Sequence, residues 1–113
     1  MEIVRFSDAK PYIAPKHFDM RSFRLQGLEA SSAETCWVGL SQFLPGGGAE
    51  RDSTPVEKIY VVLSGEVTIT VDEGEFTLSE LDSCVIKANE ARAIVNNTKH
   101  VATMLVMLQY PKG

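Results

Sequence analysis

The chain has 113 residues and a net charge of −4, from 15 acidic and 11 basic side chains. This length fits one domain, and the mild acidity argues against a nucleic-acid partner, because phosphate binding needs a surplus of Lys and Arg. The sequence has no run of about 18 uncharged apolar residues, so no membrane-spanning segment is expected. The N-terminus carries charges at Glu2, Arg5 and Asp8 and lacks an apolar signal-peptide core, which predicts a cytoplasmic protein. Cys36 and Cys84 are expected to be reduced, packed thiols rather than a disulfide framework.

Short runs of β-branched and aromatic residues, broken by turn residues, dominate the chain, and helical periodicity is nearly absent. The first 20 residues are expected to be irregular, because Pro11 and Pro15 interrupt any regular element there. The pattern predicts strands over residues 21–27, 36–44, 57–63, 66–71, 75–78, 83–87, 91–96 and 101–109.

Turn residues separate these strands. Pro45 and the three glycines 46–48 are expected to form a mobile or sharply bent loop, and Asp72-Glu73-Gly74 is typical of a hairpin turn with a solvated acidic tip. About eight strands joined by tight turns favour an all-β jelly-roll barrel, which encloses one small cavity whose mouth is the expected ligand site.

Two segments carry the motifs of a known family. Residues 45–66, PGGGAERDSTPVEKIYVVLSGE, resemble the first motif of the cupin superfamily, with Gly46 and Gly65 in place. Residues 81–97, LDSCVIKANEARAIVNN, resemble the second motif, with matches at Asp82 and Asn96.

The resemblance implies a single-domain, cupin-type double-stranded β-helix. Residues 36–113 would form the barrel, and residues 1–35 would form an N-terminal arm and strand that packs on the barrel or on a dimer partner. By the same resemblance we expect a homodimer. The apolar N-terminal residues that are expected to pack against a partner surface are Ile13, Phe18, Met20 and Phe23.

Metal-binding cupins hold their ion with three His and one Glu or Gln. The positions that the resemblance assigns to these ligands here are Asp52, Thr54, Lys58 and Arg92. Lys58 and Arg92 would repel a divalent ion, which requires imidazole, thiolate or carboxylate ligands. The only two histidines, His17 and His100, fall outside the ligand positions and are expected to be exposed in loops, with the alternative that His17 caps the barrel mouth if the N-terminal arm folds over it. The sequence therefore predicts no metal and no cofactor, and the family's oxygenase chemistry is not carried over.

Lys58 and Arg92 are expected to point inward near the barrel mouth, where two unpartnered cations would be costly. Two interpretations stay open. In the first, they bind a small anionic ligand, with a bidentate contact from Arg92 and a second contact from Lys58. In the second, one of them forms a structural ion pair with Asp52 that fills the former metal site.

Further candidates surround this pair. Asp52 could act as a general base, Lys58 as a desolvated base, and Tyr60, on the inward side of the strand that carries Lys58, as a proton donor. Thr54 and Asn96 are candidate ligand contacts, although Thr54 also suits a turn and Asn96 also suits a strand end.

The leading functional hypothesis is a metal-independent enzyme that performs proton-transfer chemistry on a small anionic metabolite, of the isomerase, cyclase, dehydratase or decarboxylase type. One alternative is a non-catalytic ligand-binding or sensory cupin. Another is a metalloprotein with unusual ligands at Glu50, Asp52 and His17.

Overall fold

The computed structural model describes residues 1–110, which form a 3-10 helix and nine strands. The elements are η1 (Phe6–Asp8), β1 (Pro11–Tyr12), β2 (His17–Gln26), β3 (Cys36–Asp52), β4 (Lys58–Ser64), β5 (Val67–Val71), β6 (Gly74–Leu78), β7 (Ser83–Ile86), β8 (Arg92–Val95) and β9 (Ala102–Gln109). Within residues 1–110, no helix has the length and apolarity needed to cross a bilayer.

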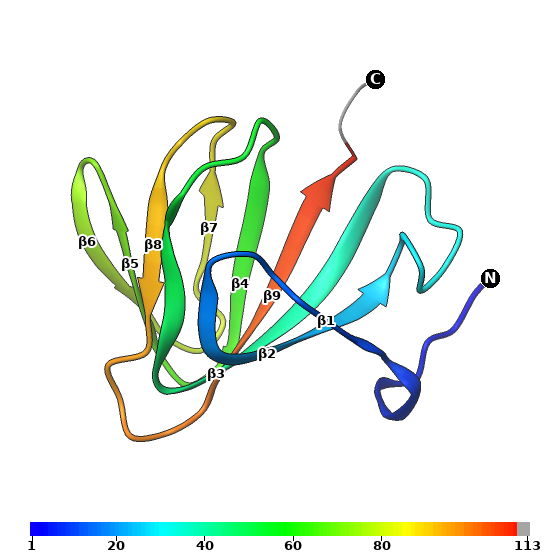
Figure 1. Ribbon diagram of the computed structural model, residues 1–113, viewed down its shortest axis with the longest axis horizontal. Helices are drawn as coiled ribbons and strands as arrows, with labels where there is room; N and C mark the ends of the chain where they lie inside the picture. Colours follow the sequence, from blue (N-terminus) through cyan, green and yellow to red (C-terminus); the bar gives the residue numbers. More distant parts are fainter. Residues whose placement is uncertain (111–113) are drawn as a thin grey trace.

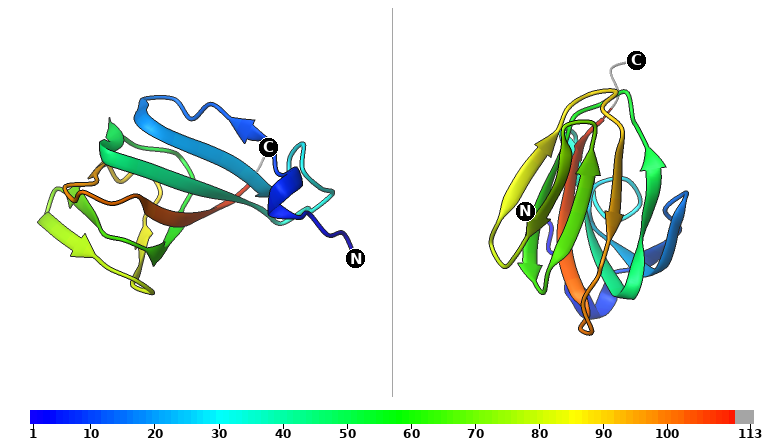
Figure 2. Two further views of the ribbon diagram at one scale, coloured as in Figure 1. Left: turned by 90° about the horizontal axis from the view of Figure 1, so that it is seen from below. Right: turned by 90° about the vertical axis from the view of Figure 1, so that its left-hand side faces the viewer.

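The strands build a nearly closed antiparallel barrel in the order β6-β5-β8-β3-β9-β4-β7 (Figure 1). β2 pairs with β3, and β1 pairs with β2 (Figure 2). The predicted all-β, single-domain barrel is therefore confirmed. β2 begins at His17, so the expectation of an irregular chain up to residue 20 was wrong.

β3 is much longer than the strand expected over residues 36–44, because the glycine run continues the strand instead of breaking it. Its first half pairs with β9 and its second half pairs with β8, so β3 joins the two halves of the barrel. A Cβ on Gly48 would collide with the backbone carbonyl of Ile94. Glycine at this position therefore permits the close approach of β3 and β8 rather than forming a loop.

Alternation along the strands places the core on the inner face of the barrel. Trp37 and Phe43 share one face of β3, as expected from their spacing, and Phe43 is fully buried. The buried apolar cluster consists of Phe43, Ala49, Tyr60, Val62, Val67, Ile69, Leu78, Ile86, Ile94, Ala102 and Met104.

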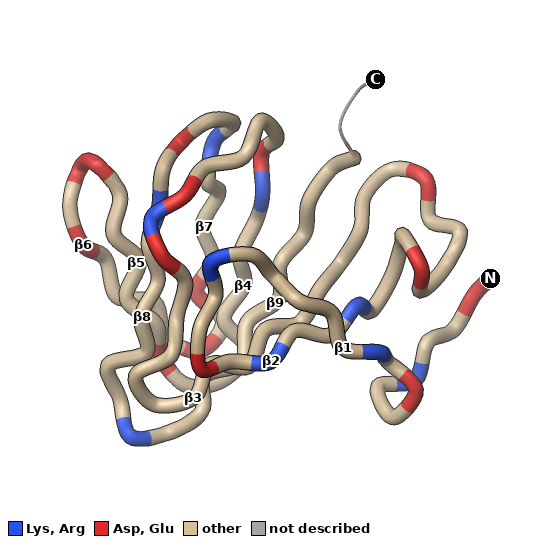
Figure 3. Tube along the Cα trace, viewed as in Figure 1, with Lys and Arg blue, Asp and Glu red and all other residues tan. Residues whose placement is uncertain are grey.

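Charged residues lie mostly outside this core, and Figure 3 shows Asp and Glu gathered mainly at turns and loops. The β5–β6 hairpin turns at Asp72 and Glu73, which are exposed as predicted. Cys36 and Cys84 are free, half-buried thiols.

The N-terminal apolar residues divide into two groups. Met20 packs against the core and the Phe23 ring lies 5.2 Å from that of Phe6, whereas Ile13 and Phe18 are exposed. The homodimer stays a prediction.

Asn96 is fully buried and is not among the residues that line the main cavity, and its hydrogen bonds fit the strand-end role; a ligand contact from Asn96 stays a prediction. Its side-chain amide donates to the backbone carbonyls of Phe43 (3.0 Å) and His100 (2.7 Å). Its carbonyl oxygen accepts from the backbone N–H (2.9 Å) and hydroxyl (2.7 Å) of Thr98. Asn96 therefore ties the end of β8 to β3 and to the following loop.

We expect Asn96→Ala to lower the free energy of unfolding by about 2–3 kcal/mol, because the buried Phe43 carbonyl loses its amide donor and the Thr98 N–H loses its acceptor. Asn97→Ala is the matched control, since Asn97 is the exposed neighbour. Chemical denaturation of both variants checks this. Equal midpoints for the two variants would contradict the structural role of Asn96.

Candidate functional site

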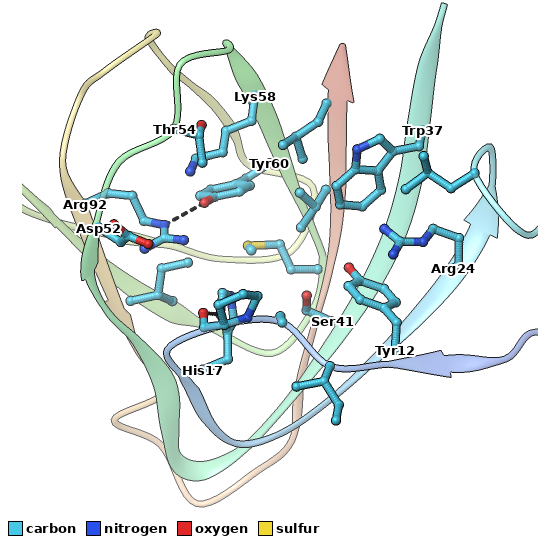
Figure 4. Close-up of a pocket in the computed structure, with 18 residues that line it drawn as sticks. Tyr12, His17, Arg24, Trp37, Ser41, Asp52, Thr54, Lys58, Tyr60 and Arg92 are labelled. Carbon is cyan, nitrogen blue, oxygen red and sulfur yellow. Dashed lines mark hydrogen bonds between the residues drawn. The ribbon is translucent and has the colours of Figure 1, made fainter. Parts of the chain in front are cut away.

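A cavity of about 330 Å³ opens inside the barrel (Figure 4). This volume is near the lower end of the range for small-molecule sites, about 300–1,000 Å³. The cavity is lined by Tyr12, Ile13, Ala14, Pro15, His17, Arg24, Leu28, Trp37, Ser41, Asp52, Thr54, Lys58, Tyr60, Arg92, Ile94, Met104, Val106 and Leu108.

Most of the predicted site residues meet in this cavity. β4 directs Lys58 and Tyr60 inward and leaves Ile59 exposed, as the two-residue period requires. Arg92 at the start of β8 is opposite Asp52 at the end of β3 in the strand register. Thr54 also lines the cavity, while its hydroxyl donates to the Val56 carbonyl at 2.9 Å.

Arg92 is 5% exposed and held by two hydrogen bonds. Its Nε donates to the Tyr60 hydroxyl at 2.7 Å, and a terminal nitrogen donates to the Glu50 backbone carbonyl at 3.0 Å. Burial raises the pKa of Tyr60, although nearby Arg92 acts in the opposite direction. Tyr60 is therefore a neutral phenol whose oxygen accepts from Arg92, which leaves its own proton available for donation.

Lys58 is 3% exposed and forms no hydrogen bond or ion pair with any residue in the range 1–110. Burial, followed by the charge of Arg92, lowers the pKa of Lys58 from 10.5 to about 8, while Asp52 partly opposes this shift. The cavity thus contains the ammonium group of a largely buried lysine, which faces the cavity and has no protein partner among residues 1–110, the situation that a bound ligand or a chemical role would explain.

Asp52 does not neutralise this pair. Its carboxylate lies 3.6 Å from Nζ of Lys16, and the structure shows no ion pair between Asp52 and Lys58 or Arg92 across the described chain. The backbone N–H of Ser53, and then Lys16, lower the pKa of Asp52, so Asp52 is ionised at neutral pH. The interpretation of a structural ion pair that fills the former metal site is therefore wrong.

His17 was expected to be an exposed loop residue, and this was also wrong. It begins β2, is half-buried and lines the cavity, whereas His100 is exposed as expected. Nδ1 donates to the Pro15 carbonyl at 2.8 Å, which leaves Nε2 as an acceptor. Burial is the largest cause of a lowered pKa at His17, and Arg92 and Lys58 lower it further, so the imidazole is neutral.

The end of the cavity away from Lys58 was not predicted from the sequence. There, the guanidinium carbon of Arg24 lies 3.7 Å from the Tyr12 ring centroid and 4.3 Å from the Trp37 ring centroid (Figure 4). The two rings meet edge to face at 5.9 Å. We call these three residues the arginine-aromatic cluster.

The residues at the metal-ligand positions do not fit a divalent ion. Lys58 and Arg92 offer no lone pair at neutral pH and would repel the ion, which leaves Asp52 and Thr54 as weak oxygen donors. Over residues 1–110, no three His, Cys, Asp or Glu side chains converge well enough to hold a metal. The alternative metal site at Glu50, Asp52 and His17 therefore finds no support.

We expect Arg92→Ala to lower the free energy of unfolding by about 2–4 kcal/mol, because the buried Tyr60 hydroxyl and the Glu50 carbonyl lose a charged donor. Arg51→Ala is the control, since Arg51 is exposed and its one ion pair within residues 1–110 is with Asp72 at 2.6 Å. Denaturant titration measures the stability of both variants. Equal free energies of unfolding for Arg92→Ala and Arg51→Ala would contradict the two hydrogen bonds of Arg92.

Comparison with known proteins agrees with this architecture. The model of the Cupin domain matches residues 39–108, so the chain belongs to the cupin domain family. It is 45% identical over 111 residues to a Mycobacterium tuberculosis protein named beta-D-galactosidase Rv1717, covering 98% of this chain and 96% of that protein.

Two solved structures share the fold. The polyketide cyclase RemF from Streptomyces resistomycificus superimposes with a TM-score of 0.86 at 18% identity, covering 96% of this chain and 79% of that one. A sugar phosphate isomerase of the cupin superfamily, SPO2919 from Silicibacter pomeroyi, gives 0.82 at 19% identity, covering 97% and 76%. At these identities the likeness shows the fold alone.

Proposed function

We propose that the chain is a metal-independent enzyme that hydrolyses a β-D-galactoside in the barrel cavity. The observation that carries the proposal is the buried, unpartnered Lys58 in the same small cavity as the ionised Asp52. The substrate class comes from the relative with 45% identity, which is named a beta-D-galactosidase.

Glycoside hydrolysis needs a proton donor at the leaving oxygen and an anionic group near the anomeric carbon. With a pKa of about 8, Lys58 is mostly protonated at neutral pH and able to release its proton. In this scheme, Lys58 protonates the glycosidic oxygen as the C1–O bond breaks. Water adds to C1, and Asp52 accepts a proton from that water. Solvent then returns the proton from Asp52 to Lys58, and galactose and an alcohol are the products.

The charged side chains of the cavity match the charges that develop when the glycosidic bond breaks. Lys58 and Arg92 stabilise negative charge on the departing oxygen, while Asp52 counters the positive charge that develops on the sugar ring. Most glycosidases use two carboxylic acid groups. Here a lysine takes the role of the acid, because Asp52 is the one carboxylate among the described residues that line the cavity.

A second candidate function is proton transfer on a small anionic metabolite, as in an isomerase, cyclase, dehydratase or decarboxylase. It is favoured by the charge of the cavity lining, where the described part of the chain places Arg24, Lys58 and Arg92 but one carboxylate, Asp52. A non-catalytic ligand-binding cupin would bind the same ligands but release them unchanged.

A panel of 4-nitrophenyl glycosides tests the proposal. We expect release of nitrophenol from the β-D-galactoside at least about tenfold faster than from the α-D-galactoside or the β-D-glucoside, since one misplaced substituent typically changes discrimination by that order. Activity should also fall as the pH rises through about 8, because Lys58 loses its proton there. Binding of the β-D-galactoside without turnover would favour the sensory alternative and contradict the hydrolase.

A further inference from the structure

The arginine-aromatic cluster forms a second recognition site inside the same cavity. Figure 4 shows Tyr12, Arg24 and Trp37 gathered at one end, apart from Lys58, Tyr60 and Arg92 at the other. The cluster takes no part in the chemistry described above, so its role needs a separate explanation.

Arg24 is fixed in place but retains free donors. Its side chain is 11% exposed, and its Nε is bound to the Glu29 carboxylate at 3.2 Å. The Tyr12 and Trp37 rings contact the guanidinium at distances typical of cation–π interactions. The two terminal nitrogens make no hydrogen bond to any residue of the described chain, so an edge of the guanidinium remains available.

Neighbouring residues explain why the cluster has this shape. Gly39 on β3 leaves room for the Tyr12 hydroxyl, because a Cβ at Gly39 would lie 2.6 Å from that oxygen. Trp37 lies two residues before Gly39 on the same inward face of β3, and β2 supplies Arg24 from the neighbouring strand. The strands therefore hold the guanidinium against two aromatic rings that lie nearly perpendicular to each other.

A guanidinium with two free terminal amino groups binds a carboxylate through two parallel hydrogen bonds, and flanking aromatic rings favour a planar ligand. We propose that Tyr12, Arg24 and Trp37 bind a planar, carboxylate-bearing group, and that the galactoside substrate is therefore acidic. The statement about the substrate rests on the proposed function, whereas the carboxylate site itself does not. The net cationic lining of the cavity, in a chain of net charge −4, agrees with an anionic ligand.

Benzoate and benzamide are matched probes, since they have the same shape and differ in charge. Trp37 is the only tryptophan of the chain, so its fluorescence reports binding at the cluster directly. We expect benzoate to bind with a dissociation constant at least about tenfold lower than that of benzamide. We also expect Arg24→Gln to raise the benzoate dissociation constant at least about tenfold, and Arg24→Lys to raise it clearly, because lysine keeps the charge but loses the planar pair of donors.

Two further variants locate the site. Lys58→Met should weaken benzoate binding less than Arg24→Gln does, because Lys58 lies at the other end of the cavity. Arg51→Gln should change it less than threefold, since Arg51 is exposed and does not line the cavity. The thermal unfolding of each variant is recorded alongside. Equal binding of the two probes, no detectable benzoate binding, or benzoate affinity that depends on Lys58 and not on Arg24 would each overturn the inference. Since benzoate carries no sugar, these outcomes are independent of whether the protein hydrolyses galactosides.

Discussion

Asp52→Asn is expected to lower kcat on 4-nitrophenyl β-D-galactoside by about 10²–10⁴-fold, the usual loss when a general base is removed. Asp52 is suited to this role because the Ser53 backbone N–H and Lys16 lower its pKa and keep it ionised. The substitution preserves the shape of the side chain and removes the negative charge. Its main effect should therefore appear in kcat rather than in the dissociation constant for the substrate.

Asp72→Asn is the matched control for this experiment. Asp72 is an exposed carboxylate that also pairs with a basic residue, Arg51, but it lies outside the cavity. Steady-state kinetics and equilibrium binding on both variants separate turnover from affinity. If Asp52→Asn keeps wild-type kcat, Asp52 is not the base; if kcat is lost while binding persists, the sensory alternative is excluded.

Lys58→Met is expected to give a protein that is more stable than the wild type and almost inactive. A tenfold change in proton affinity corresponds to about 1.4 kcal/mol. The pKa of about 8 in place of 10.5 thus means that the charged form of Lys58 destabilises the fold on the order of 3 kcal/mol at neutral pH. Methionine fills a similar volume without a charge, so it removes this penalty, while the loss of the proton donor should reduce kcat by about 10²–10⁴-fold.

The pH dependence of wild-type stability follows from the pKa of Lys58, which is about 8 in the folded chain and 10.5 in the unfolded chain. Between pH 8 and 10.5, the unfolded chain binds more protons at Lys58 than the folded chain does, so this residue makes wild-type stability rise with pH. Below pH 8 the penalty is fully present. The stability advantage of Lys58→Met should therefore be largest below pH 8 and should vanish towards pH 10.5.

Lys87→Met is the control, because Lys87 is exposed and pairs only loosely with Glu57 at 3.8 Å. Denaturant titrations of the three proteins at a series of pH values check the expectation. A Lys58→Met protein that is less stable than the wild type at pH 7 would show that the ammonium has a stabilising partner in the cavity.

The barrel and half of the site could be predicted from the sequence, because both depend on local regularities. Strict alternation in β4 directs Lys58 and Tyr60 to the same side, whatever the rest of the chain does. Turn residues such as Asp72-Glu73-Gly74 mark strand ends reliably, since few other residues suit those turns.

The errors came from features that only tertiary packing decides. The glycines at 46–48 suggested a loop, but the absence of a side chain at Gly48 lets β3 pass closely beside β8, and its absence at Gly47 lets β3 approach Asp19 of β2. Asp52 pairs with Lys16, a residue distant in sequence that the β1–β2 connection brings to the barrel mouth. The same connection leads to His17, which begins β2 and lines the cavity. Pro11 and Pro15 in this region were interpreted only as a sign of irregular chain.

The arginine-aromatic cluster also depends on tertiary packing, which the sequence pattern does not reveal. Tyr12, Arg24 and Trp37 come from three strands, and no spacing in the sequence relates them. One signal in the sequence could have indicated the cluster. On the inward face of β3, Trp37 is followed two residues later by Gly39, and the missing side chain at Gly39 leaves room for a ring from another strand.

The most direct measurement is galactoside turnover by protein whose metal content has been determined. After treatment with a chelator, and with less than one hundredth of an equivalent of any transition metal remaining, the protein should still hydrolyse 4-nitrophenyl β-D-galactoside at its full rate. Added Mn, Fe, Ni or Zn should give no increase, because Lys58 and Arg92 stand where a cation would bind. Turnover that appears only with a stoichiometric ion, or no turnover under any condition, would contradict the account.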